Sequence, residues 1–184
     1  VIDPIDGTKN FMRGVPSWST LIALIERNDD GTEKIVVGVV SAPALFRRWH
    51  GAAGLGAYVS LNKSAPKKIH VSGISTIADA SVTYSDLNNW GDYLPKVQAL
   101  LSDANRTRGF GDFWSHMLVA EGAAEVAQHL IGDAIHTFLP AYFPKIEKLE
   151  KQEEKTAYSD LIEWFFAESG FELLDDAEGR KLGL

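Results

Sequence analysis

The sequence predicts a mixed α/β fold, with strands in the first two thirds of the chain and helices after them. Two observations carry this prediction. Short apolar, β-branched runs separated by turn signals fill the first part, which is typical of strands. From residue 93 onward, apolar residues recur at helical spacing instead. With 184 residues, 45% of them hydrophobic, the chain is long enough for one substantial core.

The strand signals begin at the first residue. Val1 and Ile2 are typical of the end of a buried strand with an earlier part, so we expect the chain to be a fragment of a larger domain. An Asp-Gly turn predicts a hairpin between the next two runs, and Gly54-Leu55-Gly56 predicts another. The expected strands cover residues 18–26, 34–44, 46–53, 56–61, 67–72 and 80–85.

Helical spacing covers residues 93–103 and 111–127, with a short strand at 107–110 between them. Asp112 is the candidate N-cap of the second helix. From residue 128 the character changes, and a highly charged stretch with Glu/Lys pairs four residues apart predicts further helix. We therefore expect one domain over residues 1–127 and a divergent, mainly helical segment over residues 128–184.

Composition excludes several classes of function. The formal net charge of -7 argues against a nucleic-acid partner, which favours a basic surface. The absence of cysteine excludes disulfides, thiolate catalysis and soft-metal sites. No apolar run is long enough for a membrane helix, and no signal peptide is visible. We expect a cytoplasmic protein without membrane contact, in which oxygen or imidazole groups hold any metal.

The opening stretch, D-P-I-D-G-T, holds the most informative chemistry. Pro4 favours an extended Asp3, and Gly7 permits a tight turn. The carboxylates of Asp3 and Asp6, with the Ile5 carbonyl between them, are hard oxygen ligands that suit Mg²⁺ or Mn²⁺. Exposed amides beyond them are suited to a phosphate oxygen. The stretch thus favours metal-dependent hydrolysis of a phosphate ester.

Other interpretations of this stretch exist. Asp-Pro and Asp-Gly are common in turns, so a solvated turn explains the residue types equally well. Haloacid-dehalogenase-type phosphatases need two aspartates two positions apart, whereas Asp3 and Asp6 are three apart. An EF-hand loop needs further oxygen ligands and a late glutamate, which are absent here.

The stretch VIDPIDGTKNFMRGVPSWSTLIAL resembles the first signature of the inositol monophosphatase-like family. Three later stretches resemble the histidinol-phosphatase branch of that family: GVVSAPALFRRWHGAAGLGAYV, ASVTYSDLNNW and RTRGFGDFWSHMLVAEGAAEVA. The resemblance covers residues 1 to about 127. It implies a layered α/β/α/β/α sugar-phosphatase fold, two or three Mg²⁺ ions with Mn²⁺ as a possible substitute, and a possible homodimer. The implied partner is a small phosphorylated metabolite.

The resemblance also implies roles for individual residues. Asp3, Asp6 and the carbonyl of Ile5 are the implied metal ligands, and Asp6, Gly7 and Thr8 face the phosphate. Asp3, Asp6 and Thr8 are catalytic, Thr8 by orienting the attacking water. Gly111 and Asp112 approach the leaving-group alcohol, although Asp112 also suits a helix cap, and the two roles can coexist.

Two departures from the family pattern stand out. An upstream acidic motif that supplies a metal-binding glutamate has no counterpart in this chain. Near residue 127 the family carries a Trp-Asp signature whose aspartate is a further ligand, and Asp133 is the nearby candidate, without the tryptophan. L-histidinol phosphate or a related inositol-phosphate-type monoester is the expected substrate. A fructose-bisphosphatase or nucleotide-bisphosphate phosphatase, or a non-catalytic fragment that binds metal or phosphate, are the alternatives.

Overall fold

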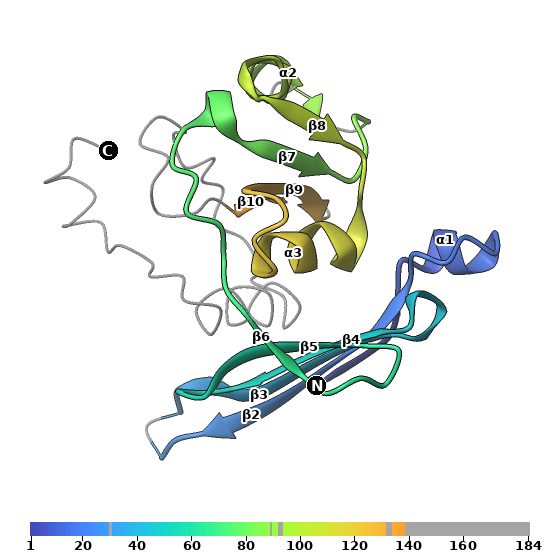
Figure 1. The fold of residues 1–184 in the computed structure, drawn as a ribbon, viewed down its shortest axis with the longest axis vertical. Helices are drawn as coiled ribbons and strands as arrows, with labels where there is room; N and C mark the ends of the chain where they lie inside the picture. Colours follow the sequence, from blue (N-terminus) through green and yellow to red (C-terminus); the bar gives the residue numbers. More distant parts are fainter. Residues whose placement is uncertain (30, 89, 92–93, 132–133, 139–184) are drawn as a thin grey trace, which may run out of the picture.

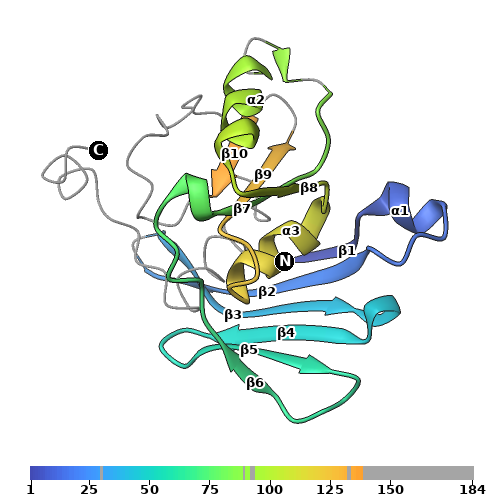
Figure 2. The same ribbon diagram turned by 45° about the horizontal axis from the view of Figure 1, so that its top comes forward.

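The computed structural model describes residues 1–29, 31–88, 90–91, 94–131 and 134–138. They form alternating layers of sheet and helix (Figure 1). A six-stranded sheet lies on one side, a four-stranded sheet lies on the other, and helix α3 (Asp112–Ala120) lies between them. Helix α2 (Leu94–Asp103) covers the far face of the four-stranded sheet (Figure 2). The predicted mixed α/β layered fold is confirmed.

The six-stranded sheet is an antiparallel meander in chain order, β1-β2-β3-β4-β5-β6. Both predicted hairpins form, because alternating apolar residues flank glycine turns that reverse the chain. In the first hairpin, Leu21 pairs with Val40 and Leu24 with Val37. The strands are β1 (Ile2–Asp6), β2 (Ser19–Arg27), β3 (Glu33–Ala42), β4 (Arg47–Ala52), β5 (Gly56–Leu61) and β6 (Lys67–Ile69).

The four-stranded sheet has the order β10-β9-β7-β8, in which β7 runs parallel to both β8 and β9. Its strands are β7 (Ser81–Tyr84), β8 (Arg106–Arg108), β9 (Val126–Ile131) and β10 (Ala134–Phe138). Short helices lie at Thr8–Met12 (α1), Pro43–Leu45 (η1) and Ile77–Asp79 (η2).

Two apolar clusters hold the layers together. The larger joins the inner face of the six-stranded sheet to α3, where Trp49 and Phe113 are both fully buried and their rings meet edge to face at 6.0 Å. The smaller joins α2 to the other sheet through Leu100, Val82 and Val126. Burial of such side chains contributes roughly 1.5–3 kcal/mol each, so α3 is held chiefly by its apolar face.

Three local expectations are wrong. Helix α3 ends at Ala120 instead of continuing to residue 127, because Gly122 adopts φ +71, a conformation that terminates helices. The chain then forms β9 and β10, so residues 126 and 127 belong to a strand where helix was expected. Ile2 belongs to an edge strand and is 64% exposed rather than buried.

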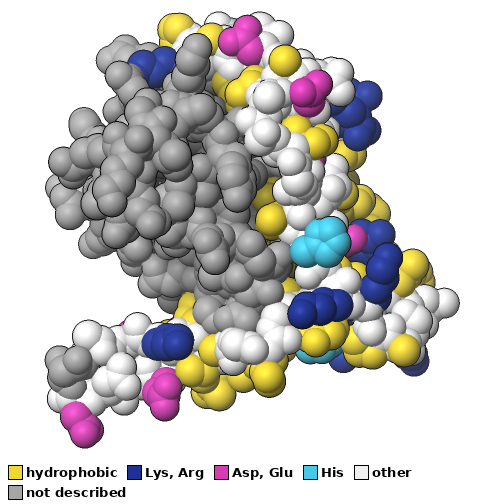
Figure 3. Space-filling view, turned by 60° about the vertical axis from the view of Figure 1, so that its left-hand side comes forward, with side chains coloured by type: hydrophobic (Ala, Val, Ile, Leu, Met, Phe, Trp, Pro, Cys, Tyr) yellow, Lys and Arg dark blue, Asp and Glu magenta, His cyan; other side chains and the backbone are white. Residues whose placement is uncertain are grey.

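The outer face of the six-stranded sheet carries exposed apolar side chains, including Ile22 and Leu24. Figure 3 shows hydrophobic side chains gathered beside Lys and Arg along this lower part of the molecule. Within the described ranges, no helix has the length and apolar character needed to cross a membrane. The division of the chain at residue 127 stays a prediction, and residues 139–184 lie outside the described residues.

Candidate active site

Strand β1 carries the acidic motif to the end of the six-stranded sheet. In a regular strand, residues three apart point to opposite faces, which would separate Asp3 from Asp6. The pairing of β1 with β2 shifts register between Asp3 and Asp6. Such an irregularity interrupts the alternation of side chains between the two faces of the sheet. The charge of Asp3 is one of the causes that raise the pKa of Asp6.

Short-range hydrogen bonds fix the motif's shape. The backbone N–H of Ile5 donates to Oδ1 of Asp3 at 3.1 Å. The hydroxyl of Thr8 donates to the Ile5 carbonyl at 2.8 Å. On the neighbouring strand, the Thr20 hydroxyl donates to the carbonyl of Pro4 at 2.9 Å. These bonds hold the predicted ligand oxygens of Asp3 and Ile5 in one compact turn.

Gly7 makes the turn from β1 into α1 possible. It adopts φ +76, which a side chain disfavours. A Cβ at this position would lie 2.8 Å from the carbonyl oxygen of Ser17 and 3.3 Å from Oδ2 of Asp112. Only glycine therefore allows this turn to pack so closely against Ser17 and the start of α3.

The N-terminus of α3 meets the motif directly. The backbone N–H of Phe113 donates to Oδ2 of Asp6 at 2.7 Å. The expectation that Asp112 caps this helix is wrong, because the N-cap is Gly111 and no side chain at that position makes a cap hydrogen bond. Asp112 lies one residue inside the helix at φ +54, and its Oδ2 accepts a 3.0 Å hydrogen bond from the Asn10 amide.

Electrostatics single out Asp6. The pKa of its carboxyl group is raised from 3.8 to about 7, chiefly by burial and in smaller part by the charges of Asp112 and Asp3. The backbone N–H groups of Phe113 and Gly7 oppose the shift, because they stabilise the ionised form. Three acidic side chains from β1 and α3 therefore share one region of negative potential.

Gly111, the other predicted substrate contact, lies where two layers approach. A Cβ there would lie 2.9 Å from the Cα of Ser85, so glycine lets the loop before α3 pass close to the end of β7. Thr8 is exposed at the same turn as Gly7. Asp133, the other candidate metal ligand, lies outside the described residues.

The donor set fits a hard divalent cation in part. Two carboxylates and a carbonyl are the oxygen ligands that Mg²⁺ prefers, and a carboxylate that accepts one or two backbone hydrogen bonds keeps further lone pairs. Positive charge would also relieve the repulsion around the ionised Asp6. Within the part of the chain that the structure describes, however, no group of three or more His, Cys, Asp or Glu side chains is placed to hold a metal. A cation bound here would therefore need water, substrate or other protein groups as further ligands.

One residue at the candidate site is not predicted from the sequence. Asn10 follows the acidic motif by four positions, and its amide reaches both Ser17 and Asp112. Nothing in the local pattern distinguishes it from a solvated helix residue, because its second partner is 102 positions away. Away from this site, Glu121 accepts hydrogen bonds from Trp49 and Arg47.

A sequence model described as the inositol monophosphatase family matches residues 1–134. The chain belongs to this family. Its curated relatives include the histidinol-phosphatase of Streptomyces coelicolor, which is 48% identical over 128 residues, and that of Mycobacterium tuberculosis, which is 46% identical over 129 residues. These matches cover 68% and 69% of this chain, respectively, and 48% of each relative. The chain therefore spans about half the length of the curated relatives it matches.

Solved structures of the family agree with the fold. An IMPase of Thermotoga maritima is 27% identical with a TM-score of 0.57, over 70% of this chain and 46% of that one. The extragenic suppressor protein SuhB of Bartonella henselae is 26% identical with a TM-score of 0.56, over 70% of this chain and 49% of that one. The family assignment and its histidinol-phosphatase branch, predicted from the signature stretches, are thus confirmed.

Proposed function

We propose that this chain carries part of the active site of a Mg²⁺-dependent phosphate monoester hydrolase whose substrate is L-histidinol phosphate. The observation that supports this most directly is the arrangement of Asp3, Asp6 and the Ile5 carbonyl in one turn, beside the amide-rich start of α3. The two histidinol-phosphatases at 48% and 46% identity support the choice of substrate.

In the proposed reaction, Asp3, Asp6 and Ile5 hold Mg²⁺, which when bound supplies Lewis-acid stabilisation to the charged phosphate oxygens. The N–H groups of Gly7 and Thr8 face a phosphate oxygen. The Thr8 hydroxyl already donates its proton to Ile5, so its lone pairs are available to accept a hydrogen bond from an attacking water. Asp112 lies against Gly7 and faces the organic part of the substrate.

Direct attack by water on phosphorus needs no covalent phosphoenzyme, and no cysteine is present to form one by thiolate attack.

Mn²⁺ as a substitute ion, the number of ions and a homodimeric assembly remain predictions. A cytoplasmic location also remains a prediction.

The test measures two quantities on the same chain. Isothermal titration calorimetry measures Mg²⁺ binding, and phosphate release is followed with L-histidinol phosphate, inositol 1-phosphate and fructose 1,6-bisphosphate. Asp6→Asn should abolish both binding and turnover, whereas Asp29→Asn, an exposed aspartate in the β2–β3 hairpin, should change neither. Absence of Mg²⁺ binding would refute the proposal. Binding without turnover would favour the non-catalytic alternative.

Inositol 1-phosphate and fructose 1,6-bisphosphate are included because another relative carries both names. The fructose-1,6-bisphosphatase/inositol-1-monophosphatase of Aquifex aeolicus is 36% identical over 83 residues. A higher kcat/KM for either compound than for L-histidinol phosphate would contradict the proposed substrate. The proposed reaction, hydrolysis of a phosphate monoester, would still hold.

A further inference from the structure

We infer that Asn10 is a positioning residue that holds the start of α3 against the acidic motif and so orients the Asp6 carboxylate for metal binding. The orientation of the carboxylate follows from the hydrogen bonds alone, while its use for metal binding rests on the proposed function. The side-chain amide of Asn10 donates its hydrogen bonds to Ser17 and Asp112 rather than to a predicted metal ligand.

The Asn10 amide joins three separate segments. Its Nδ2 belongs to α1 and donates to the Ser17 carbonyl at 3.1 Å, just before β2. The same nitrogen donates to Oδ2 of Asp112 at 3.0 Å, at the start of α3. We call this pair of bonds the Asn10 clamp. An amide nitrogen has two protons, so both are used.

Gly7 confirms that the clamp sits at the candidate site. The two acceptor oxygens of the clamp, on Ser17 and Asp112, are also the two atoms that a Cβ on Gly7 would meet most closely, at 2.8 and 3.3 Å. The clamp therefore draws the start of α3 onto the phosphate-facing turn, and Gly7 leaves the space for that approach.

The Asn10 clamp is connected to Asp6 through the peptide bond between Asp112 and Phe113. Asp112 is fixed by Asn10, and the next residue, Phe113, donates its backbone N–H to Oδ2 of Asp6 at 2.7 Å. A hydrogen bond of this length depends steeply on geometry, so a shift of Asp112 weakens it. Groups that orient a metal ligand in this way typically contribute 10–100-fold to metal affinity.

The side chain's role is separable from the role of the backbone. The Asn10 carbonyl accepts hydrogen bonds from the N–H groups of Arg13 and Val15, at 3.1 and 3.0 Å, and these form the turn after α1. Substitution of the side chain leaves those bonds available. Asn10→Asp is then the sharpest change, because an isosteric carboxylate faces two oxygens where the amide had donated to both.

The first measurement needs no metal. Amide hydrogen exchange followed by NMR reports whether Phe113 keeps its hydrogen bond to Asp6. In Asn10→Asp we expect the Phe113 amide to exchange at least tenfold faster, with the amide of the core residue Val82 unchanged. Asn28→Asp is the matched control, because the Asn28 amide also donates a side-chain hydrogen bond, at 2.9 Å to Thr32, in the distant β2–β3 hairpin.

The second measurement is the Mg²⁺ dissociation constant from calorimetry, which should rise at least tenfold in Asn10→Asp and remain unchanged in Asn28→Asp. Adding Asp112→Asn to Asn10→Asp supplies a new amide donor opposite the new carboxylate, and it should restore slow Phe113 exchange. Unchanged Phe113 exchange, or unchanged Mg²⁺ affinity despite faster exchange, would overturn the inference. If Asn10→Asp does not fold, Asn10→Ala takes its place, because it introduces no repulsion. The same tenfold changes in Phe113 exchange and in the Mg²⁺ dissociation constant are then expected.

Failure of the proposed function has a different signature. A parent chain that binds no Mg²⁺ counts against that function, while the exchange of the Phe113 amide still decides whether the Asn10 clamp orients Asp6.

Discussion

Phe113 and Asp6 are joined by a 2.7 Å hydrogen bond from a backbone N–H to a carboxylate oxygen, across 107 positions of sequence. The first turn of α3 is thereby capped by a side chain from β1. A helix N-terminus stabilises negative charge, so this contact favours the ionised form of Asp6. Burial and the neighbouring acids oppose it, and the net result is a pKa raised to about 7. One carboxylate thus serves both the fold and the candidate site.

This raised pKa predicts how the stability of the metal-free chain depends on pH. Between pH 3.8 and about 7, folded Asp6 holds its proton while unfolded Asp6 has lost it. The folded state then binds more protons, so stability falls as pH rises through this window. Asp6→Asn removes the titrating group but keeps an acceptor for Phe113. At pH 8 we expect this variant to be more stable than the parent by roughly 1–2 kcal/mol, or about 4 °C in Tm.

Thermal denaturation in EDTA from pH 4 to 8 measures this effect. The two proteins should differ least near pH 4, and added Mg²⁺ should raise the Tm of the parent only. Asp29→Asn, at an exposed position, provides the baseline for loss of a single carboxylate. A gap between parent and Asp6→Asn that does not vary with pH would contradict the assignment.

The sequence predicts most of the six-stranded sheet because its signals are local. Alternating apolar residues around Asp-Gly and Gly-Leu-Gly turns specify two hairpins without help from the rest of the chain. The hydrogen bonds within the acidic motif, such as Thr8 to Ile5, are equally local, which is why its chemistry is visible in the sequence. The family resemblance rests on these same short stretches.

The features that the sequence leaves open depend on distant partners. The register shift between Asp3 and Asp6 arises from pairing with β2, and the capping of α3 by Asp6 joins residues far apart. The extension of α3 to residue 127 is wrong because Gly122 ends the helix where it meets a distant segment. Gly122 packs so tightly that a Cβ would lie 2.8 Å from the His70 carbonyl, and its φ of +71 ends the helix.

Gly7→Ala should destabilise the chain strongly. Two penalties add at this position: a left-handed φ of +76, costing about 1 kcal/mol for a side chain, and a Cβ 2.8 Å from the Ser17 carbonyl. Gly54→Ala is a matched control, since Gly54 has φ +74 with no heavy atom within 4 Å of its Cβ position. Urea denaturation should show a loss of about 1 kcal/mol for Gly54→Ala and at least about 1 kcal/mol more for Gly7→Ala. Equal losses would show that the close approach is not maintained in solution.

Glu121 should contribute more to stability than an exposed acid. The guanidinium of Arg47 lies 3.1 Å from Oε1 of Glu121. The same oxygen accepts a 2.6 Å hydrogen bond from the fully buried Trp49. Glu121→Ala leaves a buried indole N–H without an acceptor and a partly buried guanidinium without its partner. We therefore expect the free energy of unfolding to fall by about 2–4 kcal/mol.

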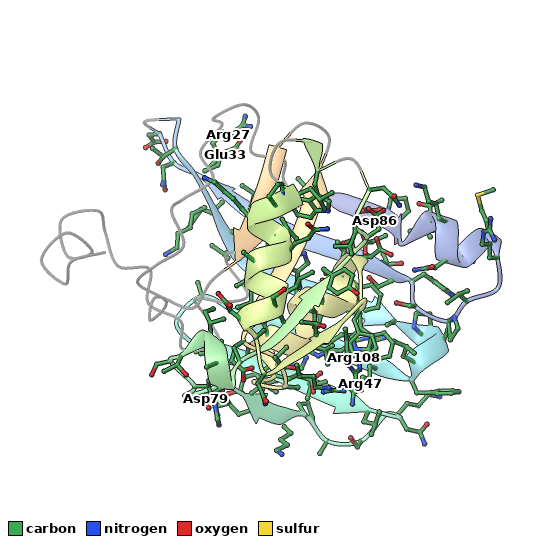
Figure 4. All side chains as sticks on the ribbon, turned by 90° about the horizontal axis from the view of Figure 1, so that it is seen from above. Arg27, Glu33, Arg47, Asp79, Asp86 and Arg108 are labelled. Carbon is green, nitrogen blue, oxygen red and sulfur yellow. The ribbon has the colours of Figure 1, made fainter. Side chains whose placement is uncertain are left out.

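Two further variants calibrate that value by chemical denaturation. Glu121→Gln keeps an acceptor for the indole and should lose about half as much. Glu33→Ala breaks the exposed pair with Arg27 at the β2–β3 hairpin (Figure 4), and it should cost less than about 1 kcal/mol. A loss for Glu121→Ala as small as that for Glu33→Ala would contradict a buried role.

Asp112→Asn tests which part of the substrate the start of α3 recognises. Asparagine tolerates the φ of +54 and can accept the Asn10 hydrogen bond through its own oxygen, so the change removes charge while retaining the contact. L-histidinol phosphate carries a cationic amine and inositol 1-phosphate does not. A carboxylate facing the organic part of the substrate therefore predicts that kcat/KM falls about 5–10-fold more for the cationic substrate, mainly through KM. Equal losses for the two substrates would contradict recognition of the amine. They would indicate instead that the charge of Asp112 acts on Asp6, which affects hydrolysis of the phosphate that both substrates share.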